Sequence, residues 1–182
     1  MKIGFKILLI GVITTIFRII EQLLIPPGSQ NVLLPSIFVG NGTMPFVFSI
    51  YGVFAYSFIA LMFLLIRNQL SGNKIMQGVK YGISCCLIWI VYLLEPLPHV
   101  AALDRITYPV ADGLALVVMG VLLGFFLGQD KPFVKNNICR YNIIPLVSIT
   151  ICFVLGRLIQ YSVFHIYSSF SSKKIETILW CV

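Results

Sequence analysis

Two pairs of polar residues interrupt long apolar segments at the same spacing. Arg18 and Glu21 lie three residues apart in the first segment, and Arg157 and Gln160 repeat that spacing in the fifth. Residues three apart share one face of a helix. Ionisable residues inside a membrane-spanning segment usually face the bundle interior and have a function. The pattern therefore predicts a polar site, in which the two guanidinium groups are suited to hold an anionic group.

The predicted site has an unbalanced charge, because it holds two arginines and one glutamate. Glu95, Asp112 or an anionic ligand entering from outside could balance it. The alternative is a closed structural network, in which Arg18, Glu21 and Arg157 satisfy one another and nothing binds. The candidate ligand-binding residues are Arg18, Glu21, Glu95, Asp112, Arg157 and Gln160.

The composition of the chain is that of a membrane protein. Of its 182 residues, 59% are apolar and only 10% are charged, which leaves too little polar surface to cover a soluble domain. A chain of this length has room for five or six spans of about 20 residues each. We therefore predict an all-α integral membrane protein, in which residues 1–182 form a single bundle of five to six transmembrane helices.

Five apolar segments are long enough to cross a bilayer. We expect the first to be a retained helix rather than a signal peptide, because it carries Arg18 and no small-residue cleavage site follows it. The C-terminal end is expected to be an interfacial tail or an incomplete sixth helix. The predicted spans cover residues 5–25, 45–66, 78–94, 111–128 and 143–167.

Basic residues cluster on one side of the predicted spans. Lys2 and Lys6 precede the first span, and other lysines and arginines lie between spans two and three and between spans four and five. The positive-inside rule places the N-terminus in the cytoplasm, although Lys173 and Lys174 weakly oppose this orientation. We expect a bacterial cytoplasmic membrane. The basic residues flank the predicted spans and do not form a patch with exposed aromatic residues. The lipid bilayer is therefore an expected partner and nucleic acid is not.

The two remaining connections lie on the opposite side. Residues 28–43 carry no charge and several large apolar side chains, which suits a re-entrant lid or a plain interfacial linker. Residues 94–112 contain carboxylates, His99 and three prolines, and we expect an ordered, hydrogen-bonded cap there. No metal-ligand spacing in this cap is diagnostic. His165, the other histidine, is expected at the headgroup level.

Small residues recur every four positions in three of the predicted spans. Such strips allow two helix backbones to approach closely. We expect them to line helix contacts within one protomer, and the alternative is contact with a second copy or another protein. The strips are Gly78, Gly82 and Cys86; Gly120, Gly124 and Gly128; and Ser148, Cys152 and Gly156.

Motifs for nucleophilic catalysis, for phosphate binding and for dinucleotide binding are not found in the sequence. We therefore expect no cofactor. The sequence favours a protein without enzyme activity over an enzyme. One enzymatic hypothesis stays open, in which Glu95, His99, Asp104 and Asp112 act on lipid at the outer surface.

The small size, the cytoplasmic N-terminus and the outward polar cluster resemble the small substrate-binding subunits of vitamin importers, as an architecture alone. That resemblance implies transport. We therefore expect a protein that binds or transports a small polar or anionic solute through a polar cluster in the outer half of the bundle. The alternative is a non-transporting membrane factor, such as an immunity, sensor or assembly protein, whose charge network is purely structural.

Overall fold

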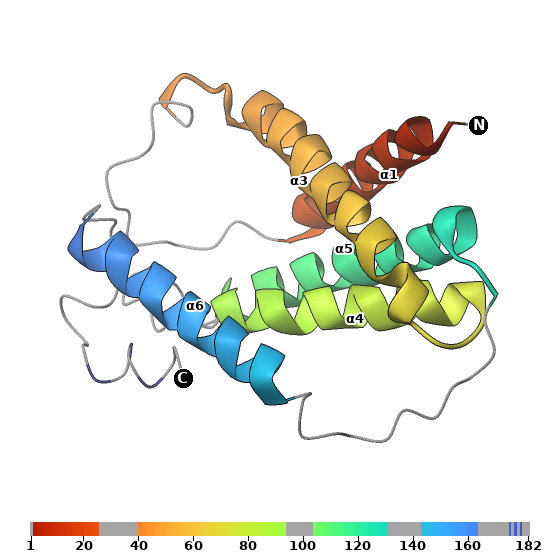
Figure 1. The fold of residues 1–182 in the computed structure, drawn as a ribbon. Helices are drawn as coiled ribbons and strands as arrows, with labels where there is room; N and C mark the ends of the chain where they lie inside the picture. Colours follow the sequence, from red (N-terminus) through yellow and green to blue (C-terminus); the bar gives the residue numbers. More distant parts are fainter. Residues whose placement is uncertain are drawn as a thin grey trace. The chain divides into compact units, whose positions relative to one another are not determined.

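The computed structural model describes residues 2–25, 40–93, 104–130 and 143–163, together with residues 175, 177 and 179. Helices form the regular structure of these residues, which confirms the predicted all-α class (Figure 1). The elements are α1 (Ile3–Leu24), α3 (Met44–Ile66), the short 3₁₀ helix η1 (Arg67–Gln69), α4 (Lys74–Leu93), α5 (Asp104–Leu127) and α6 (Ile143–Ser162).

Four helices are long and apolar enough to cross a membrane: Ile3–Leu24, Met44–Gln69, Lys74–Leu93 and Ile106–Leu127. Large apolar side chains cover much of their outer surface, as expected where lipid rather than water is the solvent. The chain is therefore a membrane-embedded protein. The full count of five or six spans stays a prediction.

The chain divides into two compact units. The first comprises Met1–Leu93 and Ala101–Val134 and contains α1, α3, η1, α4 and α5. The second comprises Leu94–Val100 and Lys135–Val182 and contains α6. The expectation of one bundle over residues 1–182 stays a prediction.

Local signals explain three of the helix ends. Pro26 and Pro27 follow the last residues of α1, and a proline disfavours helical conformation in the residue before it. Pro45 lies in the first turn of α3, where a missing N–H removes no helical hydrogen bond. Asn73 caps α4 because its Oδ1 accepts a hydrogen bond of 2.8 Å from the backbone N–H of Met76. This cap starts α4 before the predicted residue 78.

The fourth predicted span needs a correction. The expectation of a proline-restricted cap up to residue 112 is wrong in its second half, because α5 begins at Asp104 and includes Pro109. The proline lies in the second helical turn, so it removes a single backbone hydrogen bond near the helix end. Asp112 is therefore a helical residue, one turn after Tyr108 on the same face.

The closest helix pair is α4 with α5, which lie side by side and antiparallel (Figure 1). A Cβ atom added at Gly120 would lie 2.6 Å from the carbonyl oxygen of Gly78 and 2.9 Å from the Cα of Gly82. One added at Gly124 would lie 2.6 Å from the carbonyl oxygen of Lys74. The expectation that these two glycine strips line helix contacts within one protomer is thus confirmed, and the structure shows that they contact each other. In α6, a Cβ at Gly156 would meet nothing within 4 Å.

Small residues also bring α1 and α3 together. A Cβ at Gly52 would lie 2.9 Å from the Cγ2 of Thr15, and one at Gly11 would lie 2.9 Å from the carbonyl oxygen of Val53. Close packing replaces apolar burial as the stabilising force between helices in lipid. The core of the first unit is completed by the buried side chains of Ile10, Phe63, Met119 and Leu123.

Basic side chains gather where the C-terminal end of α5 meets the other helices of its unit, and we call this the basic end. Lys6 of α1 donates a 2.9 Å hydrogen bond to the carbonyl of Phe126, and Arg67 of η1 donates one of 2.8 Å to that of Leu127. Cations are favourable at a helix C-terminus, where carbonyls lack helical partners. Consecutive helices of the first unit therefore run antiparallel. The N-terminal segment and the connection between α3 and α4, both predicted to be cytoplasmic, lie at the basic end.

Candidate functional site

The end of the first unit opposite the basic end holds a buried ion pair. Arg18 of α1 binds Oδ1 of Asp112 on α5 through its Nε, and the two side chains are only 5% and 17% exposed. The other oxygen, Oδ2, accepts a 2.8 Å hydrogen bond from the indole N–H of Trp89 on α4. One carboxylate therefore connects three helices.

A second row of hydrogen bonds runs parallel to the ion pair. A guanidinium nitrogen of Arg18 donates to Oε1 of Gln22 at 3.1 Å, and the amide nitrogen of Gln22 lies 3.5 Å from the hydroxyl of Tyr108. Gln22 follows Arg18 by one turn of α1, and Tyr108 precedes Asp112 by one turn of α5. The antiparallel helices α1 and α5 are thus joined by contacts between polar side chains over two turns.

Glu21 makes no hydrogen bond to Arg18, although the two residues lie three apart on α1. Gln22 orients Arg18 instead, because residues four apart lie almost directly above one another on a helix. Glu21 remains within electrostatic range of Arg18 and Asp112, and its Oε2 is buried with no hydrogen-bond partner. The described part of the cluster therefore has two carboxylates and one guanidinium.

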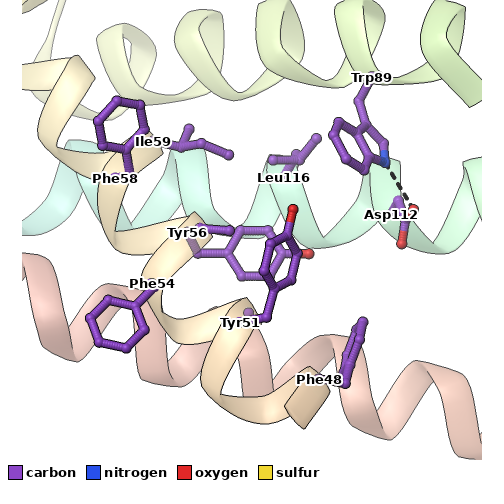
Figure 2. A pocket seen from close by; sticks show the side chains of 11 residues that line it. Phe48, Tyr51, Phe54, Tyr56, Phe58, Ile59, Trp89, Asp112 and Leu116 are labelled. Atoms are coloured by element: carbon purple, nitrogen blue, oxygen red, sulfur yellow. Dashed lines mark hydrogen bonds between the residues drawn. The ribbon is translucent and has the colours of Figure 1, made fainter. Parts of the chain in front are cut away.

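A cavity of about 490 Å³ opens beside the ion pair, between α3, α4 and α5. Figure 2 shows Trp89 extending from α4 and Asp112 from α5, joined by their hydrogen bond, while Tyr51 and Tyr56 extend from α3. We call this cavity the aromatic pocket. It is lined by Phe48, Tyr51, Gly52, Phe54, Ala55, Tyr56, Phe58, Ile59, Trp89, Asp112 and Leu116.

The remaining predicted site residues belong to the second unit or lie outside the described residues. Arg157 is on α6, with its guanidinium carbon 4.9 Å from the ring centre of Tyr161, a cation–π distance. Gln160 lies in α6, and its side chain is not among those described. The expectation that Arg157 faces Arg18 stays a prediction. Outside the described residues lie Glu95, His99, His165 and most of the predicted lid, residues 28–39.

Two members of the network, Gln22 and Trp89, were not identified from the sequence, and Tyr108 was grouped with Asp112 in the expected cap but not with Arg18. The spacing of Tyr108 and Asp112 would have pointed to one helical face, had the segment not been interpreted as a proline-restricted cap. Trp89 gives no comparable signal, since aromatic residues near the end of a span are ordinary interfacial residues.

The polar groups at this end are largely engaged within the protein. Both oxygens of Asp112 are occupied, and the pocket offers aromatic faces and the hydroxyl groups of Tyr51 and Tyr56. Within the described ranges, no group of three or more His, Cys, Asp or Glu side chains is placed to hold a metal ion. A comparison with protein-family models, with curated proteins and with solved structures found no match for this chain.

Proposed function

We propose that this protein binds a small polar solute in the aromatic pocket and acts as a transporter or as the solute-binding subunit of one. The observation that carries the proposal is a cavity of about 490 Å³ next to a buried ion pair that connects three helices. This volume lies in the range of small-molecule sites, which combine apolar walls with a few polar groups that fix orientation.

The same proposal includes a membrane orientation. The basic end lies in the cytoplasm, in agreement with the positive-inside rule, and the N-terminus is cytoplasmic. Helix α6 is the fifth span, and the membrane is a bacterial cytoplasmic membrane. The ion pair is then in the outer half of the bundle, and the aromatic pocket receives its solute from outside. The antiparallel order of the helices and the contacts of Lys6 and Arg67 support this arrangement.

The contacts of Arg18 bear on the charge of the solute. In the sequence-based hypothesis Arg18 and Arg157 hold an anion, but Arg18 is engaged by Asp112 and Gln22. An anionic solute would have to displace a carboxylate of the protein, and removing one partner of a buried ion pair costs several kcal/mol. The geometry therefore favours a polar solute that is not an anion.

A second candidate is a non-transporting membrane factor, such as an immunity, sensor or assembly protein. One observation favours it: both oxygens of Asp112 have partners within the protein, as a purely structural network requires. Under this hypothesis the network fixes the register of α1, α4 and α5, and nothing enters the aromatic pocket. A bound solute distinguishes the two candidates.

Native mass spectrometry of the protein purified in mild detergent tests the proposal. Ala55 lines the aromatic pocket, so Ala55→Trp should fill it and abolish a co-purified solute of defined mass. Leu65→Trp is the matched control, because Leu65 lies on the same helix and is highly exposed. The absence of any bound mass in the unmodified protein, or its retention in Ala55→Trp, would reject the proposal.

A further inference from the structure

We propose that the aromatic pocket selects an organic cation, such as a quaternary or protonated amine on an aromatic or compact alkyl frame. This inference rests on the proposed function, because it names the class of solute for the same site. Three observations carry it: the composition of the pocket wall, the placement of Trp89 and the charge balance beside the pocket.

The wall of the pocket is rich in aromatic rings and has a single charged residue, which is acidic. Six of the eleven lining residues are aromatic, and no basic residue is among them. A cation over the face of an aromatic ring is attracted by the negative charge density of that face, most strongly for tryptophan. The six aromatic residues are Phe48, Tyr51, Phe54, Tyr56, Phe58 and Trp89.

Trp89 is held so that it can offer a ring face to the pocket. Its N–H donates to Asp112, which fixes the edge of the indole at the carboxylate (Figure 2). Tyr92 stacks on the indole with ring centres 5.5 Å apart, and Tyr92 is not part of the pocket wall. Tyr92 therefore stacks on the indole from outside the pocket wall, while the indole itself lines the aromatic pocket.

The charge balance favours a cation in the pocket. Among the described residues of the cluster, Asp112 contacts the guanidinium of Arg18, and Glu21 lies within electrostatic range of the same guanidinium. Oε2 of Glu21 is buried and has no hydrogen-bond partner. Tyr56, which lines the pocket, lies within electrostatic range of all three charges. A cationic solute would offset the excess negative charge. An anionic solute would increase that excess in a buried place where it has no balancing cation.

A fluorescence titration tests the inference. The chain has two tryptophans, so Trp180→Phe leaves Trp89 as the only indole. The probes are benzyltrimethylammonium and phenylmethanesulfonate, which share a benzyl frame and carry opposite charges. Saturable quenching of Trp89 should show at least tenfold tighter binding of the cation. Equal or tighter binding of the sulfonate, or no saturable binding of either probe, would overturn the inference.

Matched variants connect the selectivity to the cluster. Glu21→Gln removes one negative charge without breaking a hydrogen bond, and it should weaken binding of benzyltrimethylammonium about tenfold. Asp130→Asn removes a carboxylate at the basic end, where Asp130 accepts a hydrogen bond from the backbone of Lys74, and it should leave the affinity unchanged. Equal affinities in Glu21→Gln and the parent would overturn the charge argument.

The outcome is separable from that of the proposed function. If native mass spectrometry finds a solute that is lost in Ala55→Trp while neither benzyl probe binds, the inference about a cation fails and the binding function stands. If no solute is found and no probe binds, both fail. Tighter binding of the cation, weakened in Glu21→Gln, supports both.

Discussion

Arg18 and Asp112 are 94 residues apart in the sequence and form a buried ion pair between α1 and α5. Their placement fixes the register of two antiparallel helices at the end where the aromatic pocket opens. Because the pocket wall includes Asp112, the same pair also forms the charged edge of the aromatic pocket. The contact between α1 and α5 and the proposed binding of a solute therefore involve the same carboxylate.

The ion pair predicts strong coupling between its two members. Arg18→Met leaves a buried carboxylate without its charge partner and should lower the free energy of unfolding by about 3 kcal/mol. Asp112→Leu should also destabilise the protein, because it removes the carboxylate that contacts the guanidinium and accepts the hydrogen bond of Trp89. The double variant should cost much less than the sum of the two single variants. Unfolding in mixed micelles, followed by circular dichroism, measures the three values, and strict additivity would contradict the pairing.

The close contact between α4 and α5 predicts that adding even one methyl group between them lowers the stability of the protein. In Gly120→Ala the new Cβ would lie within 3 Å of the backbone of α4, so the helices must separate, at a cost of about 2 kcal/mol. Gly4→Ala is the control, because a Cβ at Gly4 meets nothing within 4 Å. Thermal unfolding of both variants in detergent compares them. Equal midpoints would show that the two backbones are not in close contact.

The hydrogen bonds at the end of α5 predict that replacing Lys6 destabilises the protein and that replacing Lys2 does not. Lys6→Met removes the donor to the carbonyl of Phe126 and should destabilise the protein by about 1 kcal/mol. Lys2→Met removes an exposed lysine and should have little effect. Hydrogen exchange should be faster in the last turn of α5 only in Lys6→Met. Similar exchange rates in both variants would argue against a hydrogen bond from Lys6 to the last turn of α5.

The proposed orientation predicts the location of two connections. A green fluorescent protein fused after Gln69 should fluoresce, because this position is at the basic end and in the cytoplasm. Alkaline phosphatase fused after Asn41 should be active, since α3 begins on the opposite side. The reversed pattern would place the aromatic pocket in the cytoplasmic half and would reject uptake from outside.

The helices were largely predictable from the sequence because apolar runs and flanking breakers are local signals. The bounds of α1 and α3 agree with the predicted spans to within a few residues. The start of α4 was missed because its first turn contains the charged Lys74, which the prediction assigned to the preceding connection. That of α5 was missed because Pro109 near the start of a span was interpreted as part of a connection.

The site was predictable only in part. Arg18 stood out because a charge in an apolar segment needs a partner. Asp112 was one of three partners that the sequence allowed, since the pairing of helices far apart in the chain is not a local signal. The aromatic pocket could not be predicted, because aromatic residues in a membrane span serve equally well against lipid.

The most direct test of the proposed binding function is an experimental structure of the protein purified in mild detergent without added solute, at a resolution that shows side chains. We predict compact, non-lipid density in the aromatic pocket, in contact with Trp89 and Asp112. A pocket filled by the protein's own side chains, or by a lipid chain alone, would contradict solute binding and would favour a structural charge network.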